Sequence, residues 1–189
     1  MGYKTFISAV AIARKIMEMN VKEGDIVLDC TVGNGNDTLN LAKLVGEKGK
    51  VYGFDIQPIA IEITRNKLIE SGLLNRVVLI NDGHERINHY IKEKLDFVIY
   101  NLGYLPRGDK TIITKASTTL ESVKKALSLL KANGLLLVTS YTGHEGGKEE
   151  YNALLNFFKS LDQRMYNVLK FEFINQKNNP PTLFGVEKL

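Results

Sequence analysis

Short apolar segments alternate with stretches of helical periodicity along the chain of 189 residues. The first such segment is 26–28, and others lie at 50–56, 77–80, 97–100, 135–140, 168–175 and 182–188. Between most of them, apolar residues recur every three to four positions, as on one face of a helix. Strands separated by helices favour a parallel sheet covered on both faces. We therefore expect an α/β protein with a doubly wound, mostly parallel sheet of seven strands and an antiparallel C-terminal strand.

The expected helices span 5–20, the region around Leu39 to Leu44, 58–72, 84–94, 118–132 and 146–161. Pro58 suits a first helical turn, and Gly72 suits the end of the same helix. Thr118 and Glu121 have the spacing of a capping box. Residues 178–181 read as an exposed loop between the last two strands.

Length and composition limit the class of protein. The length suits one domain, 1–189. Cys30 is the single cysteine, so no internal disulfide can form, which suits a reducing compartment. The first residues lack the basic stretch of a signal peptide, and no apolar run approaches the roughly 18 residues of a membrane span. We expect a cytoplasmic protein that does not associate with membranes.

Positive charge is concentrated in two segments. Residues 1–22 sum to +3 and residues 102–131 to +4, although the whole chain carries only +4. Such runs are usually solvated helix faces. If the two segments meet on one surface, they form a modest phosphate-binding rim.

In a sheet of this kind, ligands bind beyond the carboxyl ends of the strands. The first strand is closed by Asp29, and a turn with Gly33 and Gly35 follows. The third glycine of a dinucleotide fingerprint would fall at Thr38, which argues against a bound pyrophosphate. We expect the Asp29 carboxylate to point into the pocket, where it would attract a sulfonium and an ammonium group. This favours S-adenosylmethionine over NAD.

Acidic residues also close the next two strands. Asp55 follows the second strand and can accept both hydroxyls of a ribose, although a helix cap is an equally frequent role. Asp82 follows the third strand, where a carboxylate can accept the exocyclic amine of adenine or cap the next helix. No residues have the spacing of metal ligands, because His84 and His89 are five positions apart, so no metal is expected.

The fourth strand ends in Asn101-Leu102-Gly103-Tyr104. This string resembles the Asn/Asp-Pro-Pro-Tyr motif of amino-methyltransferases, with Leu102 and Gly103 in place of the prolines. The resemblance implies that Asn101 holds an amine and that Tyr104 stacks on the substrate base. Tyr141, at the end of the fifth strand, is a second candidate for stacking.

The whole chain resembles class I S-adenosylmethionine-dependent methyltransferases, with a Rossmann-like sheet. More narrowly, it resembles a bacterial family labelled as rRNA methylases, which includes the tRNA 5-aminomethyl-2-thiouridine methyltransferases. The strings that carry this resemblance are 31–38, 82–85, 101–106 with 108–110, and 143–147. Each string alone is common, whereas their joint occurrence is specific.

The resemblance implies methyl transfer from S-adenosylmethionine to the aminomethyl nitrogen of a wobble uridine, with the anticodon region of tRNA as partner. The implied catalytic residues are Asn101, Tyr104, Asp109 and His144. The implied cofactor-binding residues are Asp29, Thr31, Gly33, Asn34, Gly35, Asn36, Asp37, Thr38, Asp55, Gln57, Asp82, Gly83, His84 and Asn101.

Several alternatives stay open at this point. The general base is Asp109, His144 or Glu145, and the substrate is tRNA, ribosomal RNA or a small amine. A non-catalytic RNA-binding protein and an NAD-dependent oxidoreductase are readings of other classes. A homodimer is plausible, because a second subunit would extend the surface available to RNA.

Overall fold

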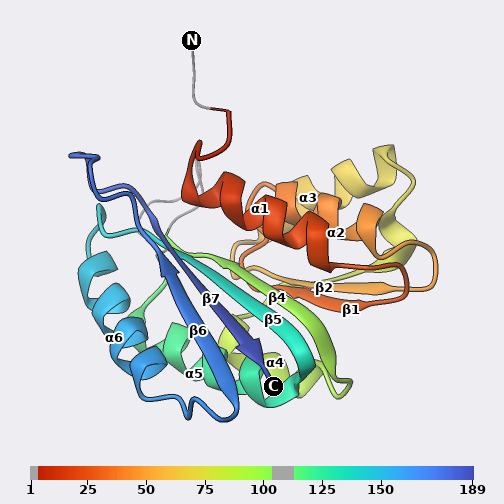
Figure 1. Cartoon of the computed structure of the whole chain (residues 1–189). Coiled ribbons are helices and arrows are strands. Elements are labelled where there is room, and N and C mark those ends of the chain that lie inside the picture. Colours follow the sequence, from red (N-terminus) through yellow and green to blue (C-terminus); the bar gives the residue numbers. More distant parts are fainter. Residues whose placement is uncertain (1–3, 104–112) are drawn as a thin grey trace.

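The computed structural model describes residues 4–103 and 113–189. Seven strands form one sheet in the order β3-β2-β1-β4-β5-β7-β6 (Figure 1). All neighbouring pairs are parallel except those of β7, which lies antiparallel between β5 and β6. The strands are β1 (Ile26–Asp29), β2 (Lys50–Phe54), β3 (Val77–Ile80), β4 (Leu95–Asn101), β5 (Leu130–Ser140), β6 (Tyr166–Phe171) and β7 (Thr182–Lys188). The expected doubly wound sheet with an antiparallel C-terminal strand is confirmed.

Helices cover both faces of the sheet. One face carries α1 (Ala9–Asn20), α2 (Asn36–Leu44) and α3 (Pro58–Glu70). The other carries α4 (Ile87–Tyr90), α5 (Ala116–Leu129) and α6 (Gly147–Lys159). The described residues also form two 3₁₀ turns, η1 (Leu74–Arg76) and η2 (His84–Arg86). Among the described residues, no helix is long and apolar enough to cross a membrane.

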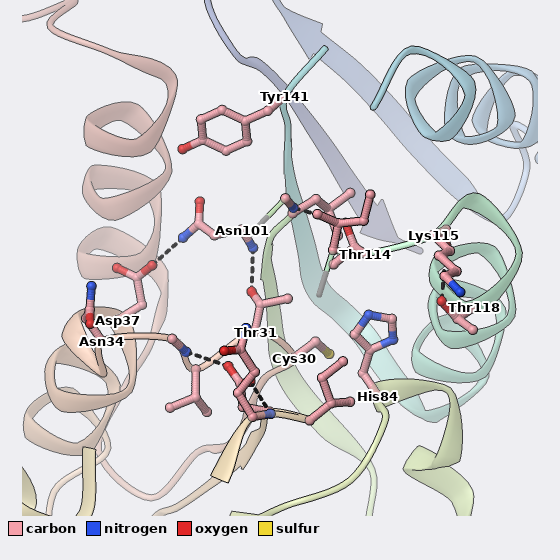
Figure 2. Close-up of a pocket in the computed structure, with 18 of the residues that line it drawn as sticks. Cys30, Thr31, Asn34, Asp37, His84, Asn101, Thr114, Lys115, Thr118 and Tyr141 are labelled. Carbon is pink, nitrogen blue, oxygen red and sulfur yellow. Dashed lines mark hydrogen bonds between the residues drawn. The ribbon is translucent and has the colours of Figure 1, made fainter. Parts of the chain in front are cut away.

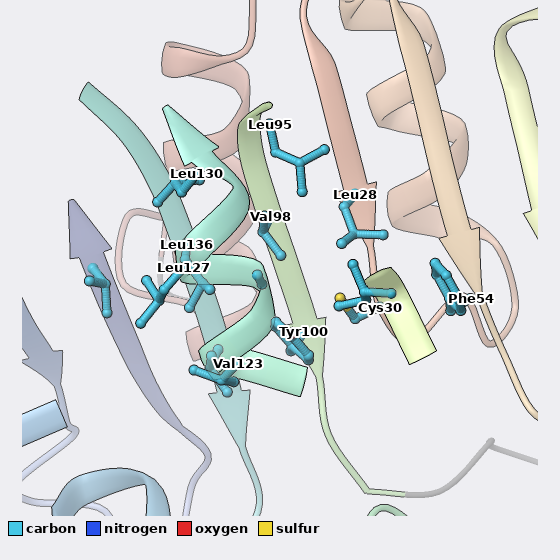
Figure 3. Close-up of a cluster of buried hydrophobic side chains, with 14 of the residues drawn as sticks. Leu28, Cys30, Phe54, Leu95, Val98, Tyr100, Val123, Leu127, Leu130 and Leu136 are labelled. Carbon is cyan, nitrogen blue, oxygen red and sulfur yellow. The ribbon is translucent and has the colours of Figure 1, made fainter. Parts of the chain in front are cut away.

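Two hydrophobic cores lie on the two faces. Side chains from β1, β4 and β5 pack against Val123 and Leu127 of α5 in one core (Figure 3). In the other core, Met17 of α1 and Leu41 of α2 pack against Val27 and Phe97. Strand residues therefore face the two cores alternately, so each strand is apolar throughout. Burial of such a side chain contributes about 1.5–3 kcal/mol, and this fixes the helices over the sheet.

Several helix limits differ from the sequence prediction. The first helix begins at Ala9 rather than at residue 5, because the Ser8 side chain accepts a hydrogen bond from the Ala11 amide and caps it. Residues 84–94 form only η2 and α4, which end at Tyr90. Pro58 occupies the first turn of α3, and Gly72 adopts a φ of 68° just beyond its end, as predicted.

The prediction that Thr118 and Glu121 form a capping box is wrong. The N-cap of α5 is Lys115, and the Thr118 hydroxyl donates to the Lys115 carbonyl from within the first turn. The next strand, β5, begins at Leu130 rather than at residue 135. The sixth strand spans 166–171 rather than 168–175, whereas the seventh matches at 182–188.

Strand order reverses between β1 and β4, so their connections leave in opposite directions. At such a switch point the loops diverge and leave a crevice beyond the carboxyl ends. The backbone amide of Asn101, at the end of β4, donates to the Thr31 hydroxyl beyond β1 at 2.7 Å. This bond joins the two loops across the switch point.

Candidate functional site

A cavity of about 750 Å³ opens at the switch point, a size that suits a small-molecule ligand. Loops that follow β1, β2, β3, β4 and β5 supply most of its wall, and α1 supplies Val10 and Arg14. Figure 2 shows the labelled wall residues around one space. Most predicted cofactor-binding residues line the cavity, namely Thr31, Gly33, Asn34, Asn36, Asp37, Asp55, Gln57, Asp82, Gly83, His84 and Asn101.

The loop after β1 is held in a tight turn by its glycines. Gly33 and Gly35 have φ values of 51° and 75°, a left-handed conformation that favours glycine. A Cβ at Gly35 would lie 2.5 Å from the Thr64 hydroxyl of α3. The backbone of this loop can therefore approach both α3 and a ligand closely.

Asp29 does not lie where the sequence predicts. The residue is 2% exposed, and its carboxylate accepts hydrogen bonds from the Thr31 amide at 3.1 Å and the Thr38 hydroxyl at 2.6 Å. Neither Asp29 nor Thr38 lines the cavity. Burial, followed by the charge of Asp37, raises the pKa of Asp29 to about 7. The carboxylate supports the loop from behind instead of pointing into the pocket.

Asp55 does face the cavity from the end of β2. Its two carboxylate oxygens accept the amides of Gly33 at 2.8 Å and Gln57 at 2.9 Å. Burial raises the pKa of Asp55, although both hydrogen bonds oppose the shift. Each oxygen retains a lone pair, so the carboxylate can still accept hydroxyl groups.

Asp82 and His84 form the wall beyond β3. Asp82 accepts hydrogen bonds from the Gly83 amide at 2.8 Å and the Tyr90 hydroxyl at 2.8 Å. His84 is buried, and burial lowers its pKa to about 4, so the imidazole is neutral near pH 7. Its Nδ1 atom is buried and has no hydrogen-bond partner among the residues that the structure describes.

Asn101 lies between the loops after β1 and β5. Its Nδ2 donates to the Asp37 carboxylate (Figure 2). Asp37 in turn lies 3.6 Å from the Arg14 guanidinium. Asn101 Oδ1 is buried and accepts no hydrogen bond from any described part of the chain. A buried amide oxygen without a partner costs stability, so this atom is a candidate ligand contact.

The other predicted catalytic residues divide into two groups. His144 lines the cavity, and its Nδ1 lies 2.8 Å from the Glu145 carbonyl. Glu145 itself is exposed and does not line the cavity. Tyr104 and Asp109 lie outside the described residues. Tyr141 also lines the cavity, and burial raises the pKa of its hydroxyl.

Sequence reasoning missed Glu150, which is fully buried in α6. Its carboxylate accepts hydrogen bonds from the hydroxyls of Thr114 at 2.9 Å and Thr119 at 2.5 Å. Thr114 also pairs with Gly103, through Gly103 N to Thr114 Oγ1 and Thr114 N to Gly103 O, both at 3.0 Å. Glu150 therefore holds Thr114, which in turn pairs with Gly103 at the end of β4. Its only sequence signal was an acidic residue on the apolar face of a helix.

Arg14, Lys115 and Asn179 are further wall residues that the sequence did not single out as site residues. Asn179 belongs to the loop predicted as exposed between β6 and β7, and it is exposed while it borders the cavity. Arg14 and Lys115 come from the two positive segments, so both segments border the cavity. Lys125 and Lys131 do not line the cavity and pair with Glu121 and Asp96 instead.

The wall is acidic, with Asp37, Asp55 and Asp82 all in contact with the cavity. Its cationic residue nearest these carboxylates, Arg14, pairs with Asp37. A pyrophosphate would be repelled here, whereas a ligand with a sulfonium and an ammonium group would be attracted. The donor set therefore fits S-adenosylmethionine. No group of three or more His, Cys, Asp or Glu among the described residues could hold a metal ion.

Comparison with family models gives two matches. The model described as "Putative rRNA methylase" matches residues 51–187. The model of protein-L-isoaspartate(D-aspartate) O-methyltransferases matches residues 1–91, which contain β1, β2 and β3.

A curated relative from Arabidopsis thaliana, named tRNA (mnm(5)s(2)U34)-methyltransferase, chloroplastic, is 38% identical over 186 residues. The match covers 93% of this chain and 68% of the relative. A Clostridium thermocellum structure described as a "putative rRNA-methylase" superposes with a TM-score of 0.95 at 44% identity. A Streptococcus mutans structure, described as a "putative methyltransferase" in complex with S-adenosylhomocysteine, superposes with a TM-score of 0.88 at 38% identity. Each of these two superpositions covers 100% of this chain and 100% of the other chain.

Proposed function

Because the chain belongs to the rRNA methylase family and is an S-adenosylmethionine-dependent methyltransferase, we propose that it methylates RNA on an amine. The proposed acceptor is the aminomethyl nitrogen of 5-aminomethyl(-2-thio)uridine at the wobble position of tRNA. The name of the Arabidopsis relative supports this substrate. The cofactor assignment excludes an NAD-dependent oxidoreductase, and membership of an enzyme family excludes a purely RNA-binding protein.

One observation carries the choice of an amine, namely the unpartnered Oδ1 of Asn101 in the cavity wall. An amide oxygen accepts a hydrogen bond from an N–H group, and it thereby orients the nitrogen lone pair away from itself. The nearby carboxylates favour entry of a protonated aminomethyl group. A pocket for a ring carbon would need no such acceptor.

The proposed cofactor contacts follow from the strand ends. Asp55 would accept the ribose hydroxyls, and Asp82 with His84 would border the adenine. The backbone of residues 31–36 would hold the amino-acid end. When bound, S-adenosylmethionine supplies an electrophilic methyl group on sulfur. The main task of the chain is then to align the amine in line with that methyl, an effect worth up to about 7–11 kcal/mol.

The reaction balances without a further reactant. The nitrogen lone pair forms the new N–C bond, the electrons of the S–C bond stay on sulfur, and one amine proton is lost. A free alkylamine is mostly protonated at neutral pH, so a group at the site must receive a proton before or during transfer. The proposed candidates are Asp109 and His144, of which His144 lies in the described wall. Glu145 is less suitable, because it lies outside the cavity.

The RNA would approach over Arg14 and Lys115, which bring both positive segments to the cavity wall. The Tyr141 ring, and Tyr104 by the family resemblance, are proposed to stack on the extruded base, at about 1–3 kcal/mol per stack. We further propose a homodimer, in which the second subunit extends this surface. Light scattering at working concentration tests that part, and a monomer contradicts it.

The decisive experiment offers methyl-labelled S-adenosylmethionine and three separate acceptors to the purified protein. These are tRNA that lacks the terminal wobble methyl group, ribosomal RNA, and a mixture of small amines. We expect label in tRNA, mapped by nucleoside mass spectrometry to methylaminomethyl uridine. Label only in ribosomal RNA or only in the amines would overturn the substrate while the cofactor assignment stands.

The variant Asn101→Ala tests the role of the amide. We expect kcat to fall about 100-fold or more, as on removal of one well-placed hydrogen-bonding group in other enzymes. The affinity for S-adenosylmethionine and for tRNA should change little. Asn167→Ala on the exposed edge strand β6 is the matched control. Unchanged turnover in Asn101→Ala would contradict the proposed contact.

A further inference from the structure

Three charged or polar side chains from three elements form a chain that ends at Asn101. Arg14 of α1 lies 3.6 Å from Asp37 Oδ1 in the first turn of α2. The other oxygen, Asp37 Oδ2, accepts the Nδ2–H of Asn101 at the end of β4 at 2.5 Å. Figure 2 shows the Asn101 oxygen turned away from Asp37, on the side of Tyr141.

An asparagine amide can be rotated by a half turn with almost no change in shape, so its environment must decide which end points where. With Nδ2 at Asp37, the contact joins a donor to an anionic acceptor. With the amide reversed, two oxygens would face each other at the same short distance, which is repulsive. An ionised Asp37 therefore permits only the orientation that leaves Oδ1 toward the cavity.

We propose that Asp37 is a positioning residue, held by Arg14, that fixes the Asn101 amide so that Oδ1 and not Nδ2 meets the acceptor amine. This inference rests on the proposed function, since it assumes an amine acceptor. It replaces the predicted contact between Asp37 and the cofactor. With the amide reversed, an N–H donor could bind the neutral amine only through its lone pair, which is then not available to attack the methyl group.

The groups around Asp37 explain why Arg14 matters. Burial raises the pKa of Asp37, whereas the charge and hydrogen bond of Arg14 and the hydrogen bond of Asn101 lower it. The Asp29 carboxylate of β1 and the Tyr141 hydroxyl beyond β5 also interact with Asp37. Arg14 is the one cation among these four neighbours, and so it favours the ionised form that orients the amide.

The first test replaces Asp37 by Asn, which can turn either end of its own amide toward Asn101. At saturating S-adenosylmethionine and tRNA, we expect kcat of Asp37→Asn to fall at least tenfold. The dissociation constant for S-adenosylmethionine should stay within twofold of the wild type. Unchanged kcat would overturn the proposal. So would weakened cofactor binding with full turnover at saturation, because it would make Asp37 a cofactor contact.

The reciprocal exchange Asp37→Asn with Asn101→Asp gives a sharper readout. Asn at position 37 then donates to the new carboxylate at 101, whose second oxygen faces the cavity as an acceptor. We expect the exchange variant to recover most of the kcat that Asp37→Asn loses. A kcat no higher than that of Asp37→Asn would contradict the orientation mechanism.

A second readout does not depend on the substrate. In a ¹⁵N-labelled protein, a side-chain amide proton of Asn101 should resonate downfield, as a donor to a carboxylate does, and Asp37→Asn should abolish that shift. The Asn101→Asp spectrum assigns the signal. An Asn101 amide without such a bond would overturn the positioning role. If the wild type methylates no aminomethyl tRNA, the proposed function fails, while this signal still decides the orientation.

Arg14→Met keeps the proposal testable if variants of Asp37 do not fold, because Arg14 is partly exposed. Loss of the guanidinium raises the pKa of Asp37. Activity that requires ionised Asp37 should then disappear at a higher pH than in the wild type as the pH falls. Lys15→Met, the exposed neighbour on α1, removes the same charge and should leave this acidic limb unchanged. An unchanged limb in Arg14→Met would contradict the proposal.

Discussion

Polar side chains lie at both ends of the sheet, but their surroundings differ. At the amino end, Asp96 accepts Lys131 with both oxygens, and Glu93 accepts Lys50 and Tyr52. These hydrogen bonds lower the pKa of Glu93 to about 2. At the carboxyl end, burial raises the pKa of Asp29 to about 7, and the Asn101 oxygen has no partner among the described residues.

The difference shows where the chain keeps polar groups for a ligand. The charged groups at the amino end find their hydrogen-bond partners within the protein and need no ligand. Buried carboxylates and an unpartnered acceptor at the carboxyl end cost stability, and such costs are typical of functional sites. Three substitutions test this difference between the two ends of the sheet.

Asp29→Asn should produce the largest effect on stability. The pKa of Asp29 is raised in the folded protein, so the folded state binds this proton more tightly than the unfolded chain. Its contribution is present at low pH and is lost as the pH rises from about 4 to about 7. The unfolding free energy of the variant, relative to wild type, should rise by about 1.4 kcal/mol per pH unit in that window.

Urea unfolding at a series of pH values measures this difference. Glu93→Gln is the control with the opposite sign. Because the pKa of Glu93 is lowered in the folded protein, its carboxylate stabilises the fold at pH values above the usual glutamate pKa. This stabilisation is lost as the pH falls toward about 2. Its difference from wild type should therefore be flat between pH 5 and 7. If the difference in unfolding free energy between Asp29→Asn and the wild type were also independent of pH in this window, the proposed contrast between the two ends would be contradicted.

Asp55→Asn should weaken cofactor binding about 10- to 100-fold, which corresponds to about 1.4–2.8 kcal/mol. The variant keeps the size of the side chain but replaces one of the two oxygens by a donor. Isothermal titration with S-adenosylhomocysteine measures the dissociation constant. Asp96→Asn makes the same chemical change at the amino end and should leave it unchanged. Equal affinity in both variants would contradict the ribose assignment.

Asp96→Asn should have the smallest effect, a loss of about 1 kcal/mol in the free energy of unfolding. The ion pair with Lys131 is partly exposed, and the Ile26 amide can still donate to the remaining oxygen. Urea unfolding at pH 7 gives the value, and methyl transfer at saturating substrates should equal that of the wild type. A clear loss of kcat would mean that the amino end also serves the reaction.

The acidic and amide residues at the carboxyl ends of the strands show what the sequence could predict about the site and what it could not. Asp55 and Asn101 could be placed at the site because parallel strands bring their carboxyl ends to one edge. Asp29 ends a strand too, but its carboxylate turns toward Thr38, nine positions further along the chain. That turn depends on how α2 packs back onto the sheet, and no local pattern records it.

The alternation of strands and helices, the sheet edge at which the polar residues lie, and the family could all be predicted from the sequence. These properties depend on hydrophobic periodicity and on motifs within short segments, which a linear chain displays directly. The contacts that link Arg14, Asp37 and Asn101, and the hydrogen bond between Thr114 and Glu150, became visible only in the folded structure. Arg14 and Asp37 are 23 positions apart in the sequence, Asp37 and Asn101 are 64 apart, and Thr114 and Glu150 are 36 apart. Only the packing of the elements brings such residues together.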